Sequence, residues 1–169
     1  MTQLNYINKP IFDHGAVEQV SEVLRGMGIK RPLICTDQDL AQIGMLDKLR
    51  DLISNEFSQI IFDQTPANPT QEAVEKAVEI YKSEGCDGII GFGGGSSMDL
   101  GKAVAIMATH EGKIVDYSIN EGGVEKISGT APLLAIPTTS GTGSEVSSGS
   151  VIIMRDGRKL ILASSYLIP

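Results

Sequence analysis

The stretch that decides the fold is Gly91-Phe92-Gly93-Gly94-Gly95-Ser96-Ser97-Met98-Asp99-Leu100-Gly101-Lys102-Ala103. An apolar run, residues 86–90, leads into it, and a helix-compatible run, residues 98–109, leads out. A strand that passes through glycines into a helix presents backbone N–H groups at the positive end of the helix dipole. The stretch therefore predicts a site that holds a phosphate or pyrophosphate without a cationic side chain.

A second polar stretch has the same character. It follows the apolar run 132–136 and reads Pro137-Thr138-Thr139-Ser140-Gly141-Thr142-Gly143-Ser144-Glu145-Val146-Ser147. Two glycine-rich loops, each preceded by a run typical of a buried strand, predict one ligand held from two sides.

Strand-like and helix-like segments alternate through residues 30–136. Hydrophobic spacing predicts strands at 31–37, 59–63, 86–92 and 132–136, and helices at 16–27, 40–53 with a break at Gly44, 71–84 with Thr70 as N-cap, and 97–109. Residues 4–12 predict a short strand or strand pair, 110–130 a surface excursion, and 150–163 a hairpin with Asp156-Gly157 at its turn. The fold class is therefore α/β, a doubly wound, mostly parallel sheet with a C-terminal β-hairpin.

Polar residues directly follow four of the predicted strands. They are Asp37, Asn68, the glycines and serines of 93–97, and Thr138-Thr139. Ligands of open α/β sheets bind at the carboxyl ends of the strands. We therefore expect these residues to gather along one edge of the sheet.

Composition limits the class of protein. The chain has 169 residues, which suits one domain over 1–169, and its 14 Lys+Arg against 21 Asp+Glu give a net charge of −7. This charge argues against nucleic acid or an anionic membrane as a partner. Cys35 and Cys86 read as buried free thiols, no signal peptide begins the chain, and no apolar run approaches membrane-spanning length. We expect a cytoplasmic protein.

Common fingerprints fail when their spacing is counted. A Gly-x-Gly-x-x-Gly motif from Gly91 needs glycine at 96, which is serine, and a Walker A motif ending at Lys102 fails at the same residue. The chain has no Gly-x-Ser-x-Gly and only two histidines, His14 and His110, both expected on the surface without partners. No cluster with metal-ligand spacing occurs in the sequence.

A family resemblance remains. Residues 93–103 resemble the Gly-Gly-Gly-Ser-x-x-Asp-x-x-Lys motif of the iron-containing (group III) alcohol dehydrogenases. Residues 137–145 are similar to that family's second motif, and Pro66-x-Asn68-Pro69 and Thr36-Asp37 follow the family's order and spacing. The resemblance covers residues 4–169. It implies an N-terminal domain that binds NAD(P), whereas Fe2+ or Zn2+ would be held by an Asp and three His of a C-terminal helical domain, outside this chain.

The resemblance also implies roles for individual residues. Gly94, Gly95 and Ser96 would hold the pyrophosphate through backbone N–H groups. Thr138, Thr139 and Thr142 would lie near adenine, ribose and pyrophosphate, with Asn68 on the adenosine side. Asp99 would lie near the nicotinamide, and Lys159 would reach the nicotinamide ribose.

Asp37 carries the prediction on cofactor choice. A carboxylate at the end of that strand accepts hydrogen bonds from both adenine-ribose hydroxyls and repels a 2′-phosphate, which favours NAD over NADP.

Structural alternatives stay open for several of these residues. Asp37 could cap the next helix, and Asp99, expected in the first turn of its helix, could serve the helix dipole. Lys102 could be solvated or structural, Lys159 could be an ordinary exposed lysine, and either glycine-rich loop could be a plain turn.

The sequence thus predicts the NAD-binding half of a metal-dependent alcohol dehydrogenase, whose full-length form moves a hydride between nicotinamide and a primary alcohol or aldehyde. We expect these 169 residues to bind cofactor without turnover, and the full-length protein to form a homo-oligomer. The alternatives are a maleylacetate reductase, a glycerol dehydrogenase, a dehydroquinate-synthase-like protein, or a non-catalytic nucleotide-binding module.

Overall fold

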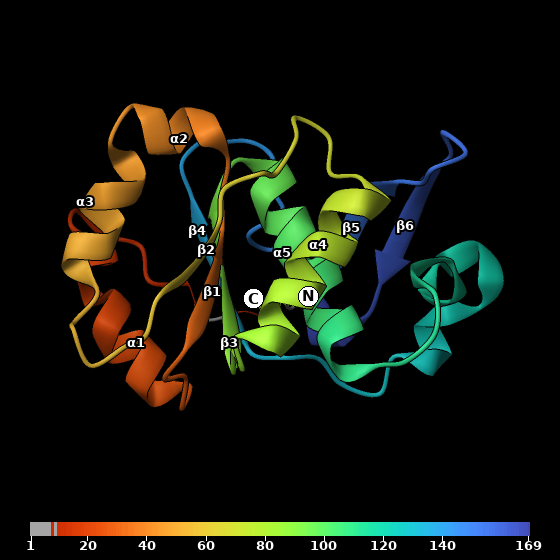
Figure 1. The fold of residues 1–169 in the computed structure, drawn as a ribbon, viewed down its shortest axis with the longest axis horizontal. Coiled ribbons are helices and arrows are strands. Elements are labelled where there is room, and N and C mark those ends of the chain that lie inside the picture. Colours follow the sequence, from red (N-terminus) through yellow and green to blue (C-terminus); the bar gives the residue numbers. More distant parts are fainter. Residues whose placement is uncertain (1–7, 9) are drawn as a thin grey trace, which may run out of the picture.

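The computed structural model describes residue 8 and residues 10–169, which form a four-stranded parallel sheet, flanking helices and a separate two-stranded hairpin (Figure 1). The sheet has the order β2-β1-β3-β4. Its strands are β1 (Pro32–Cys35), β2 (Ile60–Phe62), β3 (Gly88–Gly93) and β4 (Leu133–Pro137). The helices are α1 (Val20–Gly26), α2 (Gln38–Gln42), α3 (Met45–Leu52), α4 (Gln71–Ser83) and α5 (Gly95–Thr109), with a 3-10 turn before α1 (Ala16–Gln19) and another near the C-terminus (Ser165–Leu167). The predicted α/β class is confirmed.

The strands are apolar because both faces of the sheet are covered. All residues of β1 and β3 are buried, as expected of strands inside a parallel sheet. Register aligns Leu33 with Ile60 on one side and with Ile89 on the other, and Ile89 with Leu133. An apolar row therefore crosses all four strands.

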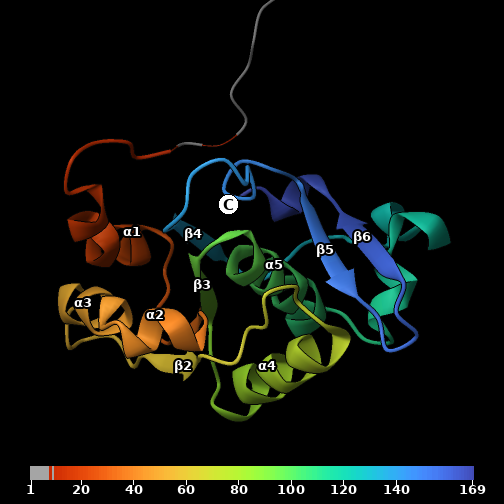
Figure 2. The same cartoon turned by 90° about the horizontal axis from the view of Figure 1, so that it is seen from above.

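Alternate residues of these strands pack into two separate hydrophobic cores, one on each face of the sheet. Ile34 and Ile90 pack with residues of α1 and α3, whereas Leu33 and Ile89 pack with residues of α4 and α5. Figure 2 shows α1, α2 and α3 on one side of the strands and α4 and α5 on the other. This arrangement is the double winding that the sequence predicts.

Local signals account for several helix ends. The Thr70 Oγ1 accepts a hydrogen bond from the Ala73 N–H at 3.3 Å, so the predicted N-cap of α4 is confirmed. Gly44 has a φ of 76° and separates α2 from α3, as the expected break. On α4, Val74, Ala77 and Tyr81 are buried and Val78 is half-buried.

The segment 110–130 is more ordered and more buried than the predicted surface excursion. It forms three short 3-10 helices, Ile114–Tyr117, Ile119–Glu121 and Gly123–Lys126. Tyr117 and Ile127 belong to the core that also contains the α5 side chains. A Cβ at Gly123 would lie 2.0 Å from the Tyr117 carbonyl carbon, so the segment closes on itself only with glycine there. The prediction for this segment was wrong because its few apolar residues are scattered among polar ones.

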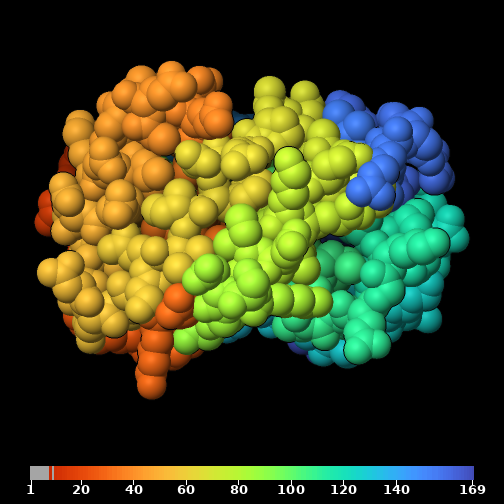
Figure 3. Space-filling model, viewed as in Figure 1, coloured from red at the N-terminus to blue at the C-terminus, as the bar shows by residue number. Residues whose placement is uncertain are grey.

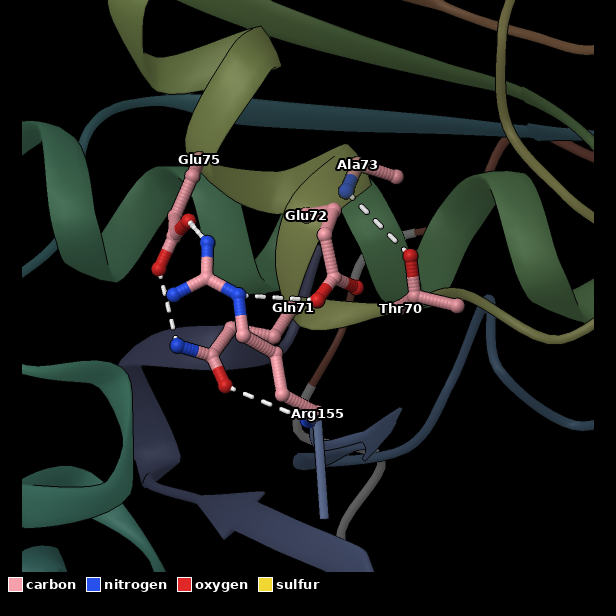
Figure 4. Close-up of polar contacts among 6 residues, drawn as sticks. All are labelled: Thr70, Gln71, Glu72, Ala73, Glu75 and Arg155. Atoms are coloured by element: carbon pink, nitrogen blue, oxygen red, sulfur yellow. Dashed lines mark hydrogen bonds and ion pairs between the residues drawn. The ribbon is translucent and has the colours of Figure 1, made fainter. Parts of the chain in front are cut away.

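The predicted C-terminal hairpin is confirmed, with β5 (Gly149–Ile153) antiparallel to β6 (Lys159–Ala163). Gly157, at the predicted turn, has a φ of 83°. Arg155 fixes this turn to the start of α4 (Figure 4). Its Nε donates to Glu72 Oε1 at 2.9 Å, its guanidinium also pairs with Glu75, and its backbone N–H donates to Gln71 Oε1 at 3.4 Å.

Of the strand or strand pair predicted at 4–12, residues 4–7 and 9 lie outside the described part of the chain, and residues 10–12 form no strand. No helix within the described residues is both long and apolar enough to cross a bilayer.

A hollow of about 420 Å³ lies between α4 and residues 107–114 (Figure 3).

Candidate functional site

A cleft of about 620 Å³ opens at the carboxyl ends of the parallel strands. In Figure 1 this is the upper edge, where β1 leads into α2 and where β2 leads into the loop before α4. Six of the predicted binding residues line it: Asp37, Gly94, Gly95, Ser96, Thr138 and Thr139. The structure therefore brings together residues that follow β1, β3 and β4, as the strand-end pattern predicts.

The N-terminus of α5 lines this cleft without a side-chain cap. Gly94 is the N-cap residue and offers no side chain to the first turn. The first intrahelical bond is donated by the Met98 N–H to the Gly94 carbonyl at 3.3 Å, so the amides of residues 95–97 precede the hydrogen-bonded part of the helix. Amides at the positive end of a 15-residue helix suit an anionic group such as a phosphate.

Close approach explains the glycines of this turn. Gly93 has a φ of 147°, and a Cβ there would lie 2.5 Å from Ser97 Oγ. A Cβ at Gly94 would lie 3.2 Å from Thr139 Oγ1, and one at Gly95 would lie 3.2 Å from Thr142 Cβ. Side chains at these positions would fill the space between the two polar loops.

Asp37 caps a helix, which is one of the two roles that the sequence leaves open, and the cap uses only one of its oxygens. Its Oδ1 accepts a hydrogen bond from the Leu40 N–H at 2.9 Å and caps α2. Among the described residues, none donates to its Oδ2, and the half-buried side chain lines the cleft. The cap therefore occupies one oxygen of the carboxylate and leaves the second for a ligand.

The cleft contains further polar residues: sequence reasoning missed Asp39, Asp63 and Thr65, whereas Ser97 belongs to the 93–97 stretch expected at this edge. Asp39 and Asp63 line the same cleft as Asp37 and add two carboxylates to it. Thr65 and Ser97 also line it, with 6% and 1% of their surface exposed, and within the described residues neither hydroxyl has a hydrogen-bond partner. Buried hydroxyls normally have a partner. Two such groups at a cleft fit a polar ligand, and their positions just after strands could have indicated them.

Two predicted residues lie next to the cleft lining. The Ser96 hydroxyl donates to the Ala67 carbonyl at 2.6 Å, which joins the glycine turn to the loop that carries the exposed Asn68. Thr142, also exposed, lies beside the α5 N-terminus, since a Cβ added at Gly95 would come within 3.2 Å of Thr142 Cβ.

Asp99 and Lys159 are farther from the lining. Asp99 is the fifth residue of α5, so its expected place in the first turn was wrong. Its Oδ1 accepts from Ser144 Oγ at 2.6 Å and its Oδ2 from the Val151 N–H at 3.0 Å. Lys159 is exposed at the start of β6, paired with Ile153, whose N–H donates to the Pro69 carbonyl at 2.9 Å. Their proposed cofactor contacts stay predictions.

Lys102 is fully buried, although an exposed lysine was among the sequence alternatives. Its Nζ lies within hydrogen-bond distance of Ser144 O, Ser147 O, Ser147 Oγ and Gly149 O. Burial lowers the pKa of Lys102 to about 8, while the carboxylates of Asp99 and Glu145 oppose this shift. His110 is half-buried, and its Nε2 accepts a hydrogen bond from the Ser128 N–H at 3.2 Å. The expectation of a surface histidine without partners was wrong.

The described residues do not fit a metal ion. No group of three or more His, Cys, Asp or Glu side chains gathers within the part of the chain that the structure describes. No reaction step is therefore derived through a metal from these residues.

Comparison with known proteins identifies the family. The family model described as iron-containing alcohol dehydrogenase matches residues 8–169. A 4-hydroxybutyrate dehydrogenase from Cupriavidus necator is 44% identical over 170 residues, which cover 100% of this chain and 44% of that protein. The chain thus spans less than half the length of this relative.

Solved structures agree. An NADH-dependent butanol dehydrogenase from Thermotoga maritima matches 100% of this chain and 42% of its own, with a TM-score of 0.89 and 27% identity. A sulfoacetaldehyde reductase from Bifidobacterium kashiwanohense, solved in complex with NAD+, matches 92% of this chain and 41% of its own, with a TM-score of 0.79 and 28% identity.

Proposed function

The chain belongs to the iron-containing alcohol dehydrogenase family, and from this we propose that its cleft binds NAD as the cofactor-binding part of a dehydrogenase. The observation that carries the proposal is the N-terminus of α5, which has no side-chain cap and lines a cleft where two buried hydroxyls have no hydrogen-bond partner among the described residues. The NAD+ complex of the related reductase supports the choice of ligand.

The pyrophosphate would bind at the start of α5. The amides of Gly94, Gly95 and Ser96 are the donors that an anion needs, and the helix dipole adds a favourable field. Thr138, Thr139 and Thr142 would border the same group from the second loop, because this loop contacts the glycine turn at Gly94 and Gly95. Glycine lets the backbone of the turn approach the phosphates closely.

The adenosine would bind on the side of the cleft that follows β1 and β2. Asp37 Oδ2 would accept hydrogen bonds from the ribose hydroxyls, while Oδ1 stays with α2. Asp39 and Asp63 add negative charge to the same cleft, which disfavours a 2′-phosphate. We therefore propose NAD over NADP, with Asn68 on the adenosine side.

The reaction is that of a larger protein. When bound, NAD accepts or donates a hydride at its nicotinamide ring. Lys159 and Asp99 would lie toward that end of the cofactor, as the family motif implies. We propose that the whole enzyme interconverts a primary alcohol and an aldehyde, and that these 169 residues alone bind cofactor without turnover, because the chain spans 44% of its dehydrogenase relative.

Calorimetric titration of the 169-residue chain with NADH tests the proposal. The native chain should bind NADH, and Gly95→Val should not, because its side chain enters the space beside Thr142. Gly26→Ala is the matched control, since a Cβ there meets nothing within 4 Å. Equal binding by native chain and Gly95→Val, or no binding by the native chain, would contradict the proposed site. Alcohol-dependent NADH formation by this chain alone would contradict the absence of turnover.

A further inference from the structure

Among the described residues, Lys102 is the charged side chain most completely removed from solvent, and the binding site described above does not use it. Its exposed fraction is 0%. Its Nζ lies 2.6 Å from Ser144 O, 2.7 Å from Ser147 O, 3.0 Å from Ser147 Oγ and 3.1 Å from Gly149 O. An ammonium group has three hydrogens, so all its donors are engaged by one segment, residues 144–149.

This segment continues the loop that borders the cleft. The Ser144 N–H donates to Thr142 Oγ1 at 3.3 Å, and Thr142 lies beside Gly95, where an added Cβ would come within 3.2 Å of Thr142 Cβ. Hydrogen bonds therefore run from Lys102 through Ser144 to Thr142, which borders the glycine turn.

The loop between β4 and β5 forms few backbone hydrogen bonds within itself. Gly141 and Gly143 have φ values of 93° and 71°, and between the end of β4 and the start of β5 the structure records one backbone hydrogen bond within the loop, from the Val146 N–H to the Gly143 carbonyl. Glycine positions cost conformational entropy to order. Beyond the short-range side-chain bonds of Thr142 and Ser147 inside it, the loop is ordered by interactions with other segments.

Asp99 supplies a second hold from the same face of α5. It lies one turn before Lys102 and binds Ser144 through Oδ1 and Val151 through Oδ2. The lysine holds the carbonyl of Ser144 and the aspartate holds its hydroxyl. Together they fix both ends of residues 144–151.

We propose that Lys102 is a positioning residue for the cofactor: its ammonium group, with Asp99, orders the 138–149 loop and so places Thr142 and its neighbours against the start of α5. The inference rests on the proposed function, because it assumes that this loop borders the bound NAD. Lys102 does not touch the cofactor. It acts through the loop. Without it the loop would become ordered only when NAD binds, and the free energy needed for that ordering would weaken the affinity for NAD.

The proposal makes affinity depend on the protonation of Lys102. The titratable groups that face it are Asp99 on the same helix and Glu145 in the loop, both of which favour its charged form, while burial lowers its pKa to about 8. A neutral amine keeps two hydrogens for the four oxygens and turns a lone pair toward them. NADH should therefore bind tightest below pH 8 and more weakly above it.

The test compares NADH binding to the native chain, Lys102→Met and Lys48→Met between pH 6.5 and 9.5. Lys48 is exposed on α3, on the opposite side of the sheet, and its substitution makes the same change in charge. Lys102→Met should raise the NADH Kd roughly tenfold at pH 7, the usual order for losing a charged hydrogen bond, and should show no fall in affinity above pH 8. Lys48→Met should match the native chain in both respects.

Ser147→Ala keeps the test decisive if Lys102→Met fails to fold. It removes one acceptor of the ammonium group and should move the alkaline fall in affinity to lower pH. Lys102→Met with native affinity and a native pH profile would refute the positioning role, as would an unchanged profile in a folded Ser147→Ala. A native chain that binds no NADH at any pH would instead refute the proposed function.

Discussion

The observed role of Asp37 as a helix cap and its proposed role as a ribose ligand can be separated by substitution. Asp37→Asn keeps an oxygen that can accept the Leu40 N–H, so α2 keeps its cap, but the charge and one acceptor for the ribose are lost. Asp37→Ala loses the cap as well. Thr70→Ala removes the cap of α4, whose N-cap side chain does not line the cleft, and is the matched control for capping alone.

The expected magnitudes follow from these contacts. Losing a cap costs about 1 kcal/mol, so Asp37→Ala and Thr70→Ala should each lower Tm by roughly 2–4 °C, while Asp37→Asn should lower it less. A 2′-phosphate with two charges at about 5 Å from one carboxylate is repelled by about 1.6 kcal/mol even in a water-like dielectric. Asp37→Asn should therefore bind NADPH roughly tenfold more tightly and NADH roughly tenfold more weakly than the native chain.

The assay is a fluorescence titration of each variant with NADH and NADPH, beside thermal unfolding of the same samples. An unchanged ratio of the two Kd values in Asp37→Asn would refute the reasoning and leave Asp37 as a cap only. A change in that ratio in Thr70→Ala would show that selectivity responds to helix capping in general and would equally refute it.

Three further predictions concern stability, each measured by urea unfolding. Gly93→Ala should cost about 2–4 kcal/mol, because it combines a φ of 147° with a Cβ 2.5 Å from Ser97 Oγ; an unchanged midpoint would contradict this. Burial raises the pKa of the Cys35 thiol, so the folded state keeps a proton that the unfolded state releases, and stability is full below about pH 8.5 and falls as pH rises. Between pH 7 and 10 the free energy of unfolding of Cys35→Ala should fall by about 2 kcal/mol less than that of the native chain. An equal fall in both proteins would refute this cause. Thr36→Val should be neutral or stabilising by up to about 1 kcal/mol, because the fully buried Thr36 hydroxyl has no partner among the described residues; a loss of more than that would reveal one.

The sequence was sufficient for the sheet, because strand and helix signals there are local. The apolar runs of β1 and β3, the break at Gly44, the cap at Thr70 and the turn at Gly157 all depend on neighbouring residues. Because ligands of such sheets bind at the carboxyl ends of the strands, the polar residues after β1, β3 and β4 were then expected at the cleft. The start of α5 was predicted two residues late, since glycine in a first turn carries no helical signal.

The remaining errors concern contacts between distant segments. The partners of Lys102 lie 42–47 residues away and those of Asp99 lie 45–52 residues away, so neither could be predicted from spacing. Tyr117 and Ile127 are buried in the core that also contains α5 side chains, a long-range packing that no local period encodes. Six of the ten residues predicted for the site line the cleft, whereas the contacts that hold its loops in place required the structure.

We propose above all that the dinucleotide lies across the carboxyl ends of the sheet. The most direct measurement is amide chemical-shift mapping of the isotopically labelled chain during titration with NADH. We expect the largest shifts at Gly94, Gly95, Ser96, Thr138 and Thr139, with the hollow between α4 and residues 107–114 unaffected. Shifts centred on that hollow, or none at saturating NADH, would contradict the claim.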